Sequence, residues 1–179
     1  MPVSARIPGL VAALVIAAGG ALAQQPAPPA NPLDAVPDKM PFDLPYGAPI
    51  TAEKALTLIV AASAESKRRG WKMNISVVDS GGNLVAFVRE TGAQIASIKI
   101  SEHKARAAVE FRRETKVFEA GIQNGLNYLI TLDGVIGSRG GVPIVDNGQI
   151  VGAIGASGGT GSQDEIVARA GVAAYPSYH

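Results

Sequence analysis

The sequence contains no cysteine, only two histidines and few aromatic residues. The absence of cysteine excludes disulfide bonds, thiolate metal sites and a cysteine nucleophile. The histidines are His103 and the C-terminal His179, so a zinc site would have to recruit carboxylates around His103. The 16 basic and 15 acidic side chains give a formal charge of +1. This balance excludes the strongly basic surface of a nucleic-acid-binding domain.

Several catalytic and nucleotide-binding motifs are also missing. No glycine-rich loop is followed by Lys and Ser or Thr, which excludes a P-loop. The glycines of residues 152–161 do not have dinucleotide-binding spacing and follow a predicted hairpin strand. Residues 155–159 match the G-x-S-x-G pattern with Ser157 as the serine, but only His179 follows it as a possible base. We interpret this stretch as a strand-to-helix corner, and the sequence leaves open whether the protein is an enzyme.

Residues 1–23 are typical of an export signal. Arg6 supplies a positive charge, residues 10–18 are almost wholly apolar, and Ala21-Leu22-Ala23 has the form that signal peptidase accepts. The apolar run is shorter than the roughly 20 residues that span a bilayer, so we expect cleavage and no stable membrane anchor afterwards. The predicted location of the mature protein is periplasmic or secreted.

Residues 24–49 hold eight of the twelve prolines of the chain. Such a segment stays extended and cannot fold alone. We expect a linker, or an arm that lies on a neighbouring subunit through Phe42, Leu44 and Tyr46; a disordered spacer is the alternative. The folded domain is then residues 50–179.

The first half of this domain predicts two helices and a β-hairpin. Thr51 suits a helix N-cap, apolar residues follow at helical spacing, and Gly70 ends the helix. Residues 73–79 and 84–90 are β-rich runs around Ser80-Gly81-Gly82-Asn83, which indicates a hairpin. A second helix is expected at 95–111, with one packed face and one face exposed to a site or a subunit.

The second half is rich in glycine, with twelve of the 21 glycines between residues 121 and 161. We expect a short helix at 116–123 and a hairpin of residues 142–145 and 149–156 around Asp146-Asn147-Gly148. A final helix is predicted at 163–174, started by Ser162 or Asp164. The order of helices and hairpins predicts an α/β (α+β) fold with an antiparallel sheet.

Six motifs follow one another along residues 50–174. They are Val77-Val78-Asp79-x-Gly81-Gly82-x-Leu84-Val85 with Arg89, Lys104-Ala105, Phe111-Arg112-Arg113-x-Thr115, Gly140-Gly141-Val142-Pro143-Ile144, Gly148 to Ser157, and Gln163-Asp164-x-x-Val167-Ala168. In type and order they resemble the GlcG/HbpS family, a haem-binding-protein-like group that includes the carboxyl-terminal domain of PduO-type proteins.

The resemblance implies a profilin-like fold, with a five-stranded antiparallel sheet and helices on both faces. We place the fifth strand near residues 129–137. Members of the family tend to form homo-oligomers. Secreted members bind haem, and others are encoded beside glycolate or diol metabolism without a settled reaction. The resemblance therefore implies an exported protein that binds a small ligand, with haem as the leading candidate.

The chain departs from the family pattern where haem could be held. Thr91 stands at a position that is commonly acidic, and the first helix has no histidine, so any axial ligand contributed from there is absent. The propionates could still bind Arg89, Lys104, Arg112 or Arg139, with His103 or Tyr128 on the iron. The alternative for each cation is a solvated or ion-paired surface residue.

A small organic acid or aldehyde is the rival ligand. Arg89 and Lys104 could hold a carboxylate, while the backbone N–H groups of Gly140 and Gly141 could bind an anionic oxygen. His103 would then act with Asp79 or Asp164 as acid and base, although a turn and a helix start explain both aspartates equally well. A third hypothesis is a non-catalytic accessory or sensor subunit.

Overall fold

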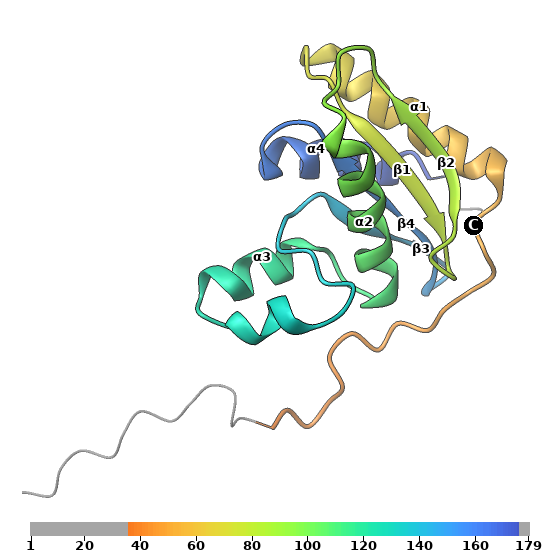
Figure 1. The fold of residues 1–179 in the computed structure, drawn as a ribbon. Coiled ribbons are helices and arrows are strands. Elements are labelled where there is room, and N and C mark those ends of the chain that lie inside the picture. The colour runs from red at the N-terminus through yellow and green to blue at the C-terminus, as the bar shows by residue number, and fades with distance from the viewer. Residues whose placement is uncertain (1–35, 176–179) are drawn as a thin grey trace, which may run out of the picture. The chain divides into compact units, whose positions relative to one another are not determined.

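The computed structural model describes residues 36–175, so the predicted export signal and the first part of the proline-rich segment lie outside the described residues. The elements are α1 (Ala52–Arg68), β1 (Asn74–Asp79), β2 (Leu84–Arg89), α2 (Ala96–Glu110), α3 (Lys116–Gln123), the 3-10 helix η2 (Asn127–Thr131), β3 (Gly141–Asp146), β4 (Gln149–Ser157) and α4 (Gly161–Ala173). Figure 1 shows this mixed α/β arrangement.

The strands form an antiparallel sheet in the order β2-β1-β4-β3. The sheet of the described residues has four strands, so the expected fifth strand near residues 129–137 is wrong. Residues 127–131 form η2 instead, and turns follow it. Positive φ angles at Gly125 and Gly134 bend the chain on both sides of η2, and Leu129 packs against Gly121 of α3. The segment therefore folds onto α3 rather than onto the sheet.

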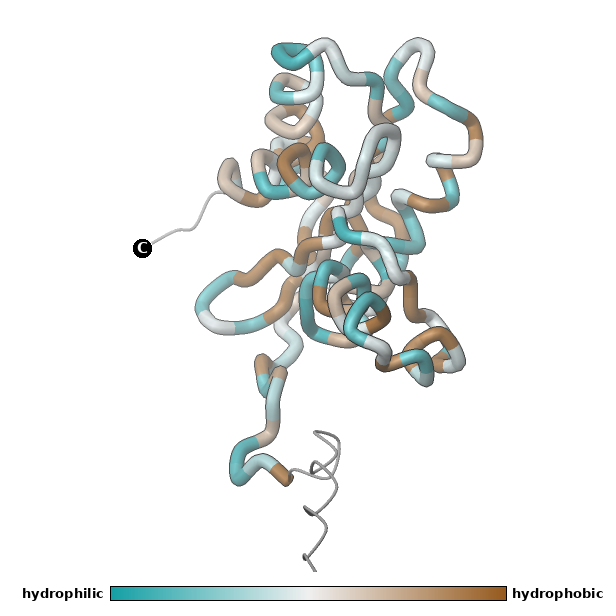
Figure 2. The backbone as a smooth tube through the Cα atoms, turned by 90° about the vertical axis from the view of Figure 1, so that its left-hand side faces the viewer, coloured by the Kyte–Doolittle hydropathy of each residue, from teal (hydrophilic) through white to brown (hydrophobic). Residues whose placement is uncertain are grey.

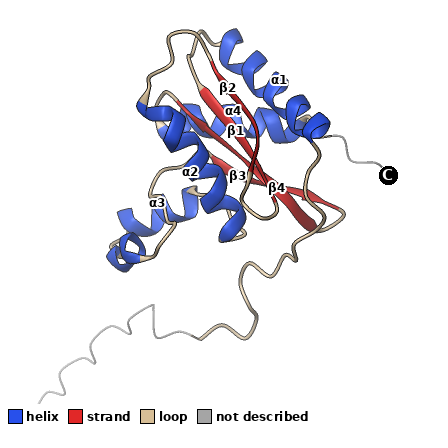
Figure 3. Cartoon of the chain, turned by 45° about the vertical axis from the view of Figure 1, so that its right-hand side comes forward, coloured by secondary structure: helices blue, strands red, loops and turns tan. Residues whose placement is uncertain are grey.

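Helices cover both faces of the sheet (Figures 1 and 3). Helix α2 packs on one face through a cluster of small and branched residues: Val78, Ala105, Ala108, Val109, Ile150 and Ala153. Helices α1 and α4 cover the other face, where the larger cluster includes Leu58, Met73, Ile75, Val77, Ile144, Ile154 and Val167. Hydrophobic and hydrophilic residues alternate around the helices (Figure 2), as expected for helices with one buried side. No helix within residues 36–175 is both long and apolar enough to span a membrane.

The first helix and the first hairpin form as the sequence predicts. The Thr51 side chain accepts from the backbone N–H of Lys54, and Gly70 takes a φ of 71° just after α1. In the hairpin turn, Asp79 Oδ1 accepts from the backbone N–H groups of Gly81 and Asn83 at 2.8 and 2.9 Å. Asp79 is thus a turn residue.

The second hairpin has the predicted turn, whereas the last helix begins earlier than predicted. Asn147 and Gly148 both have positive φ, 49° and 74°, at the tight turn between β3 and β4, as the Asn-Gly pair predicts. Helix α4 begins at Gly161, before the expected residue 163, because Thr160 and Gln163 form a capping box. The predicted start at Ser162 or Asp164 is therefore wrong.

Residues 45–47, at the end of the proline-rich segment, contact the folded domain of their own chain. The backbone of Pro45 and Gly47 exchanges hydrogen bonds with Ile150 at the start of β4, both 2.8 Å long. The Tyr46 hydroxyl donates to the terminal carbonyls of α2, 3.0 Å from Val109 O and 2.9 Å from Glu110 O. These contacts give the exposed end of α2 a cap from a distant part of the sequence.

Glycine in β4 lets α2 approach the sheet closely. A Cβ at Gly155 would overlap the carbonyl oxygen of Ser101 and lie 2.6 Å from the backbone nitrogen of Ala105. On the same face, the Ser76 and Ser101 hydroxyls hydrogen-bond at 2.8 Å. The position of α2, and of the side chains on its outer face, depends on this backbone contact.

Candidate functional site

Helix α2 presents His103, the one histidine within residues 36–175, on its outer face. Its inner face is buried through residues that include Ser97, Ser101, Ala105 and Ala108. The outer side chains line an open hollow of about 380 Å³, formed by Lys99, Glu102, His103 and Arg106. This arrangement is the half-packed, half-exposed helix that the sequence predicts.

The imidazole of His103 is oriented by a backbone carbonyl. Nε2 lies 3.1 Å from the oxygen of Gly134, in the loop that follows η2. A carbonyl can only accept, so Nε2 carries the proton in this contact, and in the neutral form of the ring the lone pair is then on Nδ1. Within the described residues the ring makes no other hydrogen bond. An imidazole held by one nitrogen and open at the other is the usual arrangement of a metal ligand.

Two cations lie on the same face as His103. Arg106 contacts Glu102 at 2.6 Å and donates from Nε to the carbonyl of Gly82 at 3.2 Å. Lys99 forms no ion pair within residues 36–175. No group of three or more His, Asp or Glu side chains in that range is placed to hold a metal ion. The face thus offers one nitrogen ligand and positive charge.

Lys104 lies on the inner side of α2, in a buried ion pair. Its ammonium is 2.7 Å from Asp164 Oδ2, and the two side chains are 1% and 4% exposed. The ammonium also donates to the carbonyl of Ala156 at 3.3 Å. Asp164 Oδ1 accepts from the backbone N–H groups of Gly158 and Gly159 at 3.1 and 3.0 Å. The Lys104 ammonium and the Asp164 carboxylate therefore bond to each other and to the backbone, near the connection from β4 to α4.

Gly140 and Gly141 surround this ion pair. Gly140 has a φ of 115°, and a Cβ there would lie 2.8 Å from Asp164 Cβ and 3.3 Å from Lys104 Nζ. The N–H of Gly141 donates to Thr115 Oγ1 at 2.9 Å. The structure therefore brings together three sequence-predicted ligand residues, Lys104, Gly140 and Gly141, in an interior contact between α2, β3 and α4.

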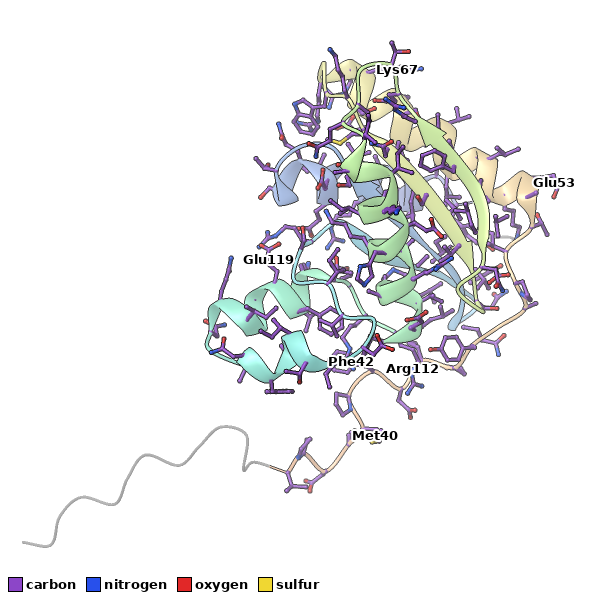
Figure 4. All side chains as sticks on the ribbon, viewed as in Figure 1. Met40, Phe42, Glu53, Lys67, Arg112 and Glu119 are labelled. Carbon is purple, nitrogen blue, oxygen red and sulfur yellow. The ribbon has the colours of Figure 1, made fainter. Side chains whose placement is uncertain are left out.

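Arg112 ends α2. It takes a positive φ of 54°, and the N–H groups of Arg112 and Arg113 bond back to Val109 and Ala108, which is a Schellman motif. Its guanidinium donates to Leu44 O at 3.4 Å. Together with Phe42, which is near it in Figure 4, it lines an apolar hollow of about 400 Å³ beside β3. This places Arg112 at the junction with the proline-rich segment.

Arg89 is the last residue of β2 and pairs with Asn74 of β1. With Lys67 and Lys72 it lines an open hollow of about 480 Å³ between the end of α1 and the end of β2. Lys104 is buried against Asp164 and does not line this hollow, so the two cations that we expected to hold one carboxylate do not share a site.

Arg139 and Tyr128 also lie away from His103. Arg139 donates from Nε to Glu119 Oε1 at 2.8 Å and from its backbone N–H to Oε2 at 2.7 Å, and it reaches Glu165 at 3.5 Å. Burial alone would raise the pKa of Glu165, but hydrogen bonds and charge from Arg169 and Lys116 outweigh it and lower the pKa. Tyr128 is half exposed on η2 and does not line the His103 hollow.

Three side chains take positions that the sequence did not predict. Lys67 and Lys72 line the same open hollow as Arg89. Thr115 belongs to one of the sequence motifs, and its hydroxyl oxygen accepts a hydrogen bond from the Gly141 N–H. The one signal in the sequence was the density of cations at residues 67–72.

Comparisons with known proteins agree with this fold. The family model described as "Haem degrading protein HbpS-like" matches residues 50–173. Protein GlcG of Escherichia coli K12 is 40% identical over 108 residues, which are 60% of this chain and 81% of GlcG.

Two solved structures share the fold. Klebsiella pneumoniae protein ORFY aligns with a TM-score of 0.70 and 27% identity over 81% of this chain and 99% of its own. A double mutant of Streptomyces reticuli HbpS aligns with a TM-score of 0.68 and 28% identity over 79% and 97%. With a family model that covers residues 50–173, this chain belongs to the HbpS-like family.

Proposed function

We propose that this protein binds haem on the outer face of α2, with His103 as the iron ligand. The observation that carries the proposal is the hydrogen bond between His103 Nε2 and Gly134 O, which orients the ring and leaves Nδ1 with its lone pair. The family description, "Haem degrading protein HbpS-like", supports haem as the ligand.

The residues of this face fit a haem in their chemistry. Imidazole is a common axial ligand of haem iron. Lys99 and Arg106 lie one turn to either side of His103 and can each take a propionate carboxylate. When bound, haem supplies redox and oxygen chemistry; the side chains of α2 bind and orient it. Binding of this kind also suits a sensor or accessory subunit.

An absorbance titration of the full chain with ferric haem tests the proposal. We expect a saturable shift of the Soret band, and an affinity at least about tenfold weaker in His103→Ala, which corresponds to roughly 1.4 kcal/mol. His179→Ala is the matched control because it removes the other histidine of the sequence. Identical titrations of both variants would contradict the assignment of His103, and the absence of saturable binding would reject the function.

Lys99→Gln and Arg106→Gln test the propionate contacts separately. Each should weaken haem binding and reduce its dependence on salt, because a charged contact to the ligand is lost. The position of the Soret band should stay unchanged, since neither residue touches the iron. A variant with altered band position and unaltered affinity would contradict these roles.

We also propose that the protein is exported and that it self-associates. The signal-like residues 1–23 support export, which fractionation of the native host tests. Strand β2 is an edge strand of the sheet, and Leu84 and Phe87 on it are 46% and 40% exposed. Open apolar edges tend to pair with a second copy. Light scattering of the wild type and of Phe87→Glu would show whether this edge forms the interface.

A further inference from the structure

We propose that the hollow between the end of α2, the start of α3 and the outer strand β3 binds a small carboxylic acid with an apolar body. The hollow measures about 400 Å³, within the roughly 300–1,000 Å³ of most small-molecule sites. In Figure 4, Phe42 and Arg112 of its lining lie where the segment from Met40 reaches the domain. None of the lining residues belongs to the hollow of His103, so this is a second site.

Apolar side chains from three segments line the hollow. They are Phe42 and Leu44 from the proline-rich segment, Val117 from α3, and Pro143 and Val145 from β3. Leu44, Val117 and Val145 are 39–40% exposed. The hydrocarbon part of a ligand would remove this surface from water, which favours binding.

Two adjacent guanidiniums border the apolar surface, and printed contacts with other lining residues place both of them there. The Arg113 guanidinium lies over the Phe42 ring, with Cζ 3.5 Å from the ring centroid. Arg112 Nη1 donates to Leu44 O at 3.4 Å, and Arg113 Nε donates to Phe111 O at 2.9 Å. The other N–H groups of the two guanidiniums make no hydrogen bond within residues 36–175, so they are available to a ligand.

Neither of these arginines has an acidic partner in the described part of the chain. Glu114 lines the hollow, but its carboxylate pairs with Lys116 at 2.9 Å and with Arg169 at 2.6 Å. Burial, and then the positive charge of Arg112, lower the pKa of Arg113, because both disfavour its charged form. Partly buried charges in proteins are usually paired. A bound anion would supply the missing partner and relieve the repulsion between the two guanidiniums.

The donors and the apolar surface together favour an acid with a hydrocarbon or aromatic body. The two oxygens of one carboxylate can each accept from one guanidinium, and Arg binds carboxylates with directed hydrogen bonds. Pro143 has no backbone N–H, so the outer edge of β3 offers an incomplete hydrogen-bond ladder to a peptide strand. A small apolar acid therefore fits the hollow better than an extended peptide does.

Calorimetric titration of the full chain with decanoate, below its micellar concentration, tests this site. We expect saturable binding at one site per chain, weakened at least about tenfold in Arg112→Gln and in Arg113→Gln. Arg68→Gln is the matched control, since Arg68 pairs with Glu65 on α1 and does not line the hollow. Val145→Asp should also weaken binding, because it places a second negative charge beside the ligand.

Two further ligands separate the charged from the apolar contribution. Decanol keeps the hydrocarbon chain without the charge, and acetate keeps the carboxylate without the chain. Because each retains one kind of contact only, each should bind at least about tenfold more weakly than decanoate.

Three outcomes would overturn the proposal. They are the absence of saturable binding, equal binding by the wild type and both arginine variants, and decanol or acetate binding as tightly as decanoate. Thermal unfolding of each variant checks that it is folded, and Val145→Asp provides the test if an arginine variant is not. His103→Ala should bind decanoate as the wild type does, so failure of this site and failure of the haem site are separately visible.

Discussion

Removal of the Lys104 ammonium should destabilise the protein strongly, because it leaves a buried carboxylate without its counter-charge. In Lys104→Met the side chain keeps much of its length and loses only the charge. Asp164 would stay 4% exposed, with the two N–H groups of Gly158 and Gly159 as its remaining donors. These bonds compensate the carboxylate only in part.

The expected loss follows from the burial of both partners. Breaking a buried ion pair by removal of one partner costs about 3–5 kcal/mol, and the two retained N–H contacts favour the lower end. In a domain of this size each kcal/mol lowers the melting temperature by roughly 2–4 °C. We therefore expect Lys104→Met to lose about 3 kcal/mol and to melt roughly 6–12 °C lower.

Urea unfolding of the variants of a double-mutant cycle measures the free energy that the Lys104–Asp164 pair contributes. Asp164→Asn alone should also destabilise, since it leaves the ammonium buried and uncompensated. The double variant Lys104→Met, Asp164→Asn should lose less than the sum of the two single losses, because no lone charge remains. A loss below about 1 kcal/mol in Lys104→Met, or strict additivity in the cycle, would refute the reasoning.

Two further predictions concern the helix contacts and the acid response. Gly155→Val should cost about 3 kcal/mol or more in urea unfolding, because its side chain would displace α2 from β4; a loss under about 0.5 kcal/mol would contradict the close contact. Hydrogen bonds from Arg68 and Arg69 hold the pKa of Glu65 at about 2, below its ordinary 4.5. The stabilisation from Glu65 is therefore complete above about pH 4.5 and is lost as the pH falls toward 2. Glu65→Gln should show a weaker loss of stability across that range than the wild type, and parallel curves would contradict the shift.

Local sequence signals predicted the turns and helix starts that depend on neighbouring residues. Asn147-Gly148 and the turn around Gly82 adopt positive φ angles, and Thr51 caps α1, because the required chemistry lies within a few residues. The prediction of a fifth strand was wrong for the opposite reason. Whether residues 129–137 join the sheet or fold onto α3 depends on contacts such as Leu129 with Gly121, which no short window of sequence contains.

The candidate site shows the same limit more clearly. Lys104 and Lys67 are both helical lysines in the sequence, yet one is buried against Asp164 and the other lines an open hollow. The difference comes from which helix face meets the sheet and from a partner 60 residues away. His103 could be singled out early because histidine is rare here, but its orientation by Gly134 depends on a loop 31 residues further along the chain.

In the proposed haem complex, His103 Nδ1 binds the iron while Nε2 keeps its proton toward Gly134. The most direct measurement is nitrogen NMR of the histidine side chains, recorded before and after the addition of gallium(III) protoporphyrin, a diamagnetic haem analogue. Two histidines in the chain make the spectrum simple to assign. We expect a large shift of the His103 Nδ1 resonance with Nε2 still protonated; an unchanged Nδ1 resonance in the saturated complex would contradict ligation by His103.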